Sequence, residues 1–152
     1  MKKYCIRIIL LLFIWFSFDM TGFSIGDTIL VEAAWNSIDG IWWLMFLLIS
    51  ILFILKDRIG KYMLFIFIFL WSIIQFYSHW YYTLFGATEK KIISYNNYFK
   101  NTYHIIPASE TIIIPDFYHI ILHIFILAAL FSLLIYIIDN RKIKNYKYIN
   151  KD

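Results

Sequence analysis

Four apolar segments, each long enough to cross a lipid bilayer as a helix, constrain the fold of this chain most strongly. A hydrocarbon layer about 30 Å thick needs about 20 helical residues, because each residue adds about 1.5 Å along the axis. The chain of 152 residues is 62% hydrophobic and 16% charged, and a water-soluble fold of this size could not bury so much apolar surface. The sequence therefore predicts an all-α integral membrane protein, with residues 1–152 forming one domain of four transmembrane helices in an antiparallel bundle. The predicted spans are about residues 4–23, 38–55, 62–85 and 116–138.

The first segment has a basic start and an apolar run from Ile8 to Phe18, a pattern shared by signal peptides and first membrane spans. No small-x-small cleavage site follows the run at the usual close distance, so we expect an uncleaved span. Asp19 falls near the outer end of this span. It is either an interfacial carboxylate at the helix end or part of a polar site on the outer face.

Basic residues flank the predicted spans unevenly. If the N-terminus is cytoplasmic, only Lys90, Lys91 and Lys100 lie outside, and the other eleven Lys and Arg lie inside. This bias predicts a multi-pass protein of the cell membrane with both termini cytoplasmic and residues 139–152 as a basic cytoplasmic tail. The short, basic-flanked, uncleaved first span is typical of a bacterial cytoplasmic membrane protein. Seven of the ten acidic residues fall outside, which makes the outer face net negative (3 minus 7) and attractive to cations.

The connections between the spans differ in length and character. Residues 56–61 form a short basic turn. Between the first two spans, Asp27 to Trp35 is either a short helix lying on the membrane surface or an ordinary loop. A long, partly ordered extracytoplasmic loop separates the third and fourth spans, and we expect it to fold over the outer helix ends. Within it, Thr88 is a plausible N-cap of a short amphipathic helix, and residues 103–106 and 111–114 are β-prone runs.

A polar stripe follows the second half of the third span. Ser72, Gln75 and His79 are spaced by three and four residues, which places them on one face of a helix, and Thr83 and Gly86 continue the pattern. We expect this face to turn toward other helices, because lipid cannot form hydrogen bonds with it.

Histidines near the start of the fourth span form the strongest candidate site. Asp116, His119 and His123 share one side of a helix, and His79 lies at a similar depth on the neighbouring span. These four residues could ligate zinc, copper(II), iron or manganese, or two of the histidines could ligate a haem b from both sides. Alternatives are a structural hydrogen-bond cluster between helices, and proton-relay or quinone chemistry.

Small residues lie on the opposite side of the same span. Ala128 and Ser132, with Ala129 beside them, form a small-x-x-x-small patch at which another helix can approach closely. We expect this patch to pack within the bundle, against a partner membrane protein or against a second copy in a homo-oligomer.

Several functional classes leave no trace in the sequence. There is no phosphate-binding glycine loop, no nucleophile elbow and no paired cysteine, and no aromatic-interleaved basic patch indicates nucleic acid. The lipid bilayer is therefore the one predicted partner besides protein. The sequence favours a non-enzymatic accessory or interaction subunit that works through its extracytoplasmic face. The alternatives are a metal- or haem-binding redox or transport component, and a membrane enzyme that acts on a lipid-borne substrate with Glu89 or Glu110 assisting a histidine.

Overall fold

The computed structural model describes residues 1–149, and their side chains as far as residue 141. Within this part, four stretches are long and apolar enough to cross a membrane. They are α1 (Lys2–Thr21), α2 (Ile38–Leu55), the continuous run Asp57–Phe85 and the Phe117–Arg141 part of α6 (Phe117–Ile149). The prediction of four helices of membrane-spanning length and composition is confirmed, and such a set indicates a multi-pass membrane protein.

The third stretch contains three helical elements in succession. It begins as α3 (Asp57–Gln75), widens into the π-helix η1 (Phe76–Trp80) and ends as α4 (Tyr81–Phe85). The Tyr81 N–H reaches the carbonyl of Phe76, five residues back, which is the hydrogen-bond spacing of a π-helix. The predicted single helix is therefore interrupted at the level of His79.

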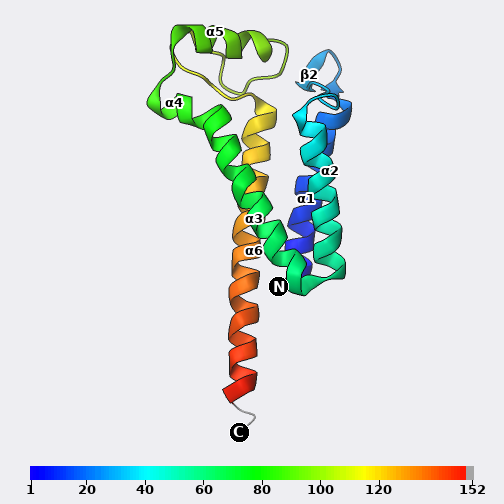
Figure 1. Ribbon diagram of the computed structural model, residues 1–152. Coiled ribbons are helices and arrows are strands. Elements are labelled where there is room, and N and C mark those ends of the chain that lie inside the picture. Colours follow the sequence, from blue (N-terminus) through cyan, green and yellow to red (C-terminus); the bar gives the residue numbers. More distant parts are fainter. Residues whose placement is uncertain (150–152) are drawn as a thin grey trace.

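Each of the four long helices packs against two of the others (Figure 1). Helix α1 lies against α2 and α6, and α3 lies against α2 and α6. Aromatic rings fill the centre, where Phe16 meets Trp71 at 4.6 Å between centroids and Phe46 stacks on Phe67 at 6.0 Å. Many large apolar side chains on the outer helix faces remain exposed, a distribution typical of proteins surrounded by lipid.

One end of the helices, which we call the turn end, carries the N-terminus and the connection between α2 and α3. The predicted tight turn between the second and third spans is present but is shorter than the expected 56–61: it is the single residue Lys56, and the helix already begins at Asp57. A carboxylate is favourable in the first helical turn, and the Tyr136 hydroxyl donates to Asp57 at 2.7 Å. Lys2 and Lys61 each lie 3.4 Å from the same carboxylate. The glycine at position 60 lets α3 pass close to the backbone of Phe53.

The opposite end, the loop end, carries the folded connections (Figure 1). Strands β1 (Phe23–Ile25) and β2 (Thr28–Val31) form an antiparallel hairpin whose turn contains Gly26 at φ +58. A surface helix over 27–35 was one of the two alternatives for this segment, and it is wrong. The run of β-branched and apolar residues in β2 follows a glycine turn, and strand pairing satisfies its backbone.

Residues 86–116 fold across the loop end beside this hairpin. Helix α5 (Glu89–Tyr98) begins after Thr88, as the N-cap pattern predicts, and buries Ile92. The β-prone runs 103–106 and 111–114 form no strand. Instead, the Tyr103 N–H donates to Ile29 at 2.8 Å, the Tyr103 carbonyl accepts from Phe117 at 2.9 Å, and a lone bridge joins Ile29 to Thr102. The loop is therefore held to the hairpin and to α6 around Tyr103.

Helix α6 extends well past the level of the turn end (Figure 1). The predicted span ends at residues 139–142, but the helix continues to Ile149, because no Gly or Pro interrupts it. The predicted basic tail therefore begins as helix, and its last residues, 150–152, lie outside the described part of the chain.

Candidate functional site

A cavity of about 550 Å³ lies at the loop end, between the helices and the two folded connections. We call it the loop-end cavity. Helices α1, α2, α3, η1 and α6 form its sides, and the chain segments around residues 31–39 and 98–102 form its rim. The side chains on which the argument rests are Phe16, Asp19, Trp42, Trp71, Gln75, His79, Asp116, Tyr118 and His119.

Asp116 and His119 form the most tightly bound pair on its wall. Asp116 immediately precedes α6, and its Oδ1 accepts hydrogen bonds from the His119 backbone N–H at 3.0 Å and from Nδ1 of the His119 ring at 2.6 Å. Asp116 is only 1% exposed. Burial alone would raise the pKa of this carboxyl, but the hydrogen bonds and charge of His119 outweigh burial and hold the pKa below its usual value. The side chain is both the helix cap and the orienting partner of His119.

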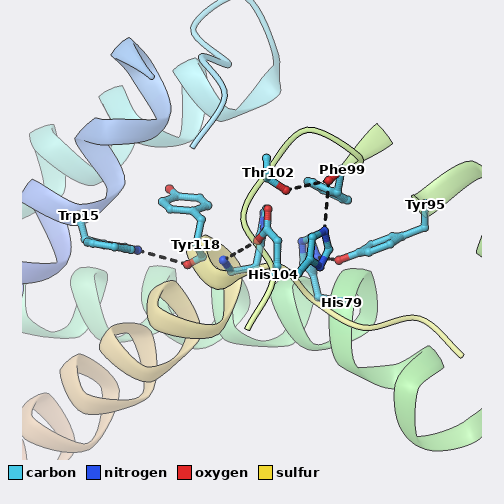
Figure 2. Close-up of polar contacts among 9 residues, drawn as sticks. Trp15, His79, Tyr95, Phe99, Thr102, His104 and Tyr118 are labelled. Carbon is cyan, nitrogen blue, oxygen red and sulfur yellow. Dashed lines mark hydrogen bonds and ion pairs between the residues drawn. The ribbon is translucent and has the colours of Figure 1, made fainter. Parts of the chain in front are cut away.

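His79 lies directly against this pair. Its ring stacks on that of His119 with centroids 3.9 Å apart and planes 26° apart. Its Nδ1 lies 2.7 Å from the Tyr95 hydroxyl of α5 (Figure 2). Burial, with a smaller contribution from the negative charge of Asp116, raises the pKa of the Tyr95 phenol above its usual value. Tyr95 therefore stays protonated and links α5 to the site.

The polar stripe is only partly retained. Gln75 and His79 both line the cavity, and Ser72 does not. The oxygen Oε1 of Gln75 is buried and has no hydrogen-bond partner in the described chain. Thr83 turns instead to backbone, donating to the carbonyls of His79 at 3.0 Å and Ile113 at 2.6 Å.

His123 stands apart from the other predicted ligands. It is not part of the cavity wall, its ring meets Trp80 edge-on at 5.9 Å, and its Nδ1 is buried without a partner. Within the described residues, no three His, Cys, Asp or Glu side chains are grouped so that they could hold a metal ion. The stacking of His79 on His119 agrees with this, because imidazole binds a metal in its own plane and two nearly parallel rings do not point at one ion.

The small-residue patch on α6 lies against α1. Ala129 is fully buried, and the Cys5 thiol of α1 donates to the Ser132 carbonyl at 3.2 Å. Ala128 is half-buried beside them. A second link joins the same two helices nearer the cavity, where Trp15 donates to the Tyr118 carbonyl at 3.2 Å (Figure 2).

Asp19 is the residue of the cavity whose importance sequence reasoning left open. It is 9% exposed and lies in the last turn of α1, and no side chain or backbone N–H in the described chain donates to its carboxylate. The excess of acidic residues on the predicted outer face was the sequence pattern that could indicate a role for Asp19. The part played by Tyr95 is missed, because one more tyrosine in a chain with twelve carries no signal.

Comparisons with known proteins identify no relative of this chain. No family model matches the chain, and no curated protein or solved structure matches it either.

Proposed function

We propose that this protein is an accessory or interaction subunit of a cell membrane, in which both termini are cytoplasmic and the loop end is the extracytoplasmic working face. The observation that carries the proposal is the asymmetry of the two ends. The hairpin, α5, the long loop and the cavity all gather at one end, whereas the other end has a one-residue connection (Figure 1).

The charge distribution supports the orientation. Basic residues flank the helices at the turn end, and the loop end carries most of the acids. Positively charged flanks stay on the cytoplasmic side of a membrane, so this arrangement favours a cytoplasmic turn end.

The surface of the loop end supports an interaction role. Eight large apolar side chains of the loop end are exposed although they lie outside the four spanning stretches, and exposed apolar surface of this extent marks contact sites. They are Ile25, Trp35, Ile93, Tyr98, Tyr103, Ile105, Ile106 and Ile112. Another membrane protein or a second copy of this chain would bury them.

Topology and contact can be tested together. Alkaline phosphatase, which is active only outside the cytoplasm, is expected to be active when inserted after Glu110 and inactive when fused to Asp152. A photo-crosslinking residue at Ile105 is expected to give a discrete protein adduct, and one at Leu55, exposed at the turn end, is expected to give none. An active fusion at Asp152, or no adduct from Ile105, would contradict the proposal.

The Asp116–His119 pair favours a second candidate, a membrane enzyme acting on a lipid-borne substrate. Because Nδ1 of His119 is held by Asp116 at 2.6 Å, Nε2 is left as the nitrogen that could exchange a proton with a substrate in the cavity. Glu89 and Glu110 do not line the cavity, so Asp116 takes the assisting role in this candidate. Mass spectrometry of a membrane lipid extract incubated with the purified protein tests it: conversion must occur with wild type and stop with His119→Gln.

A further inference from the structure

We propose that the loop-end cavity binds a ligand that carries an ammonium group, with its charge against Asp19 and its apolar part against Trp42 and Trp71. This inference rests on the proposed function, since it assigns a chemical class to a ligand bound at the same extracytoplasmic face. It starts from the charge of the wall. Four acids line the cavity, Asp19, Glu32, Asp39 and Asp116, together with His79 and His119, and no Lys or Arg does.

The placement of Asp19 has no explanation in folding stability. It lies in the last turn of α1, where the helix dipole disfavours a negative charge. Asp19 as a whole is nine-tenths buried, its carboxylate lies on the cavity wall, and no group in the described chain donates a hydrogen bond to it; a largely buried carboxylate without a partner is costly. The backbone nevertheless fixes it in place, because its carbonyl accepts from the Ala34 N–H at 2.6 Å. A cation entering the cavity would supply the missing partner.

Two more polar groups on the wall lack partners. Oε1 of Gln75 and the hydroxyl of Tyr118 are both buried and unpaired within the described residues, and Tyr118 is 2% exposed. Native proteins pair nearly all of their buried polar atoms, and Gln75 and Tyr118 are the two residues of the cavity wall whose buried side-chain oxygens are unpaired within the described chain. The Gln75 oxygen and the Asp19 carboxylate accept hydrogen bonds, and the Tyr118 hydroxyl can donate or accept. A ligand with several N–H donors, such as an ammonium, would satisfy the two acceptors.

Aromatic side chains make the rest of the wall suitable for an organic cation. Phe16, Trp42 and Trp71 line the cavity, and the faces of such rings attract cations and cover apolar groups. A volume of about 550 Å³ is in the range of small-molecule sites and far exceeds a bare ion. The site is therefore built for an organic ammonium rather than a metal.

An ammonium could arrive as the headgroup of a membrane lipid or as a free amine, and two arms of one experiment separate these sources. The full-length protein is purified in a neutral maltoside detergent. Calorimetric titration with butylammonium is compared with butanol, which has the same chain without the charge. Native mass spectrometry compares retention of phosphatidylethanolamine with that of phosphatidylglycerol.

The ammonium member of at least one pair is expected to bind about tenfold more tightly than its uncharged or anionic counterpart, a difference typical of one charge-assisted hydrogen bond. Asp19→Asn is expected to abolish this preference. Asp27→Asn removes an exposed acid of the same end that does not line the cavity, and is expected to keep it. If Asp19→Asn fails to fold, Gln75→Met provides the second variant, with an expected loss of about threefold because a single neutral acceptor is removed.

Binding in the lipid arm alone identifies a headgroup, and binding in the amine arm alone identifies a free amine. Absence of preference in both arms, or a preference that persists in both Asp19→Asn and Gln75→Met, overturns the inference. Its failure is distinct from failure of the proposed function. The wild-type protein can fail to bind an ammonium while alkaline phosphatase inserted after Glu110 is active and the crosslinker at Ile105 gives its protein adduct.

Discussion

The two ends of the helices each carry a carboxylate, and the two carboxylates differ in whether they have partners. At the turn end, Asp57 receives a hydrogen bond from Tyr136 at 2.7 Å and lies 3.4 Å from both Lys2 and Lys61. At the loop end, Asp19 faces a cavity and has no donor in the described chain. The Asp57 carboxylate links α1, α3 and α6, whereas the Asp19 carboxylate accepts no hydrogen bond in the described chain.

The difference separates a structural role from a binding role. Charges that are paired inside a protein hold elements together, and a charge without a partner costs stability that only a ligand recovers. The turn end is closed by ion pairs and by close helix contact. The loop end holds the cavity, the unpaired acceptors and the exposed apolar loop, so binding belongs there.

The largest effect is expected from Gly60→Ala at the turn end. A Cβ at this position would overlap Cα of Phe53 and lie 2.5 Å from its backbone N, and backbone atoms cannot move aside as a flexible side chain can. We expect a loss of about 3 kcal/mol in the free energy of unfolding, measured by tryptophan fluorescence in mixed detergent and dodecyl sulfate micelles. Ile59→Ala, at an exposed neighbour, should change it by less than about 0.5 kcal/mol. Equal stability of the two variants would show that the turn end is not tightly closed.

Removing the charge from each carboxylate tests the comparison directly. Asp57→Asn should destabilise the protein by about 2 kcal/mol, because it leaves the buried Lys61 without its counter-charge. Asp19→Asn should be neutral or stabilising by up to about 1 kcal/mol, because it removes a largely buried charge that accepts no hydrogen bond in the described chain. The same unfolding assay measures both. Similar losses in the two variants would mean that Asp19 has a structural partner after all.

Acid should weaken the loop end through Asp116. Its pKa is lower in the folded protein than its usual 3.8, so the stability it contributes is complete above about pH 4 and is lost as the pH falls through the lower folded value. At neutral pH, Asp116→Asn should cost about 1 kcal/mol from the weakened helix cap. Below pH 4 the gap between wild type and variant should narrow, as followed by thermal unfolding. A gap that stays constant would exclude a depressed pKa.

The smallest effect is expected from Tyr95→Phe, which removes the hydroxyl beside His79. A loss of about 1 kcal/mol should be confined to the loop end, because the bond joins α5 to η1 only. Hydrogen exchange should become faster in α5 and stay unchanged in α2. Tyr98→Phe is the matched control, since Tyr98 is 68% exposed on the same helix. Equal hydrogen-exchange rates in the two variants would show that the Tyr95 hydroxyl does not stabilise the loop end.

Periodic and local patterns made the helices predictable, and contacts between distant residues did not. Span length follows from the number of consecutive apolar residues, and α5 begins where a threonine precedes an acidic residue. The pairing of Asp116 with His119 follows from their spacing on one helix turn. The hairpin was missed because its support comes from Tyr103, more than 70 residues away in sequence from Ile29.

The cavity was only partly predictable. The excess of outer acids indicated the sign of its charge, and the matching depth of His79 and His119 indicated that these two could meet. Neither pattern shows that Asp19 lacks a donor, because a missing partner is a property of the whole packed structure. The separation of His123 was equally hidden, since its four-residue spacing from His119 predicts a shared face whether or not a neighbouring helix meets it.

The π-helix η1 has a consequence for how this protein tolerates changes in length. One extra residue in a turn rotates everything that follows by about 100° relative to a regular helix. Deleting one residue from the segment 76–78, ahead of His79, would restore a regular helix and at the same time turn the imidazole of His79 away from the His119 ring on α6. The alignment of the two rings therefore depends on an exact residue count between α3 and α4, and a shortened segment would stay helical while losing the site.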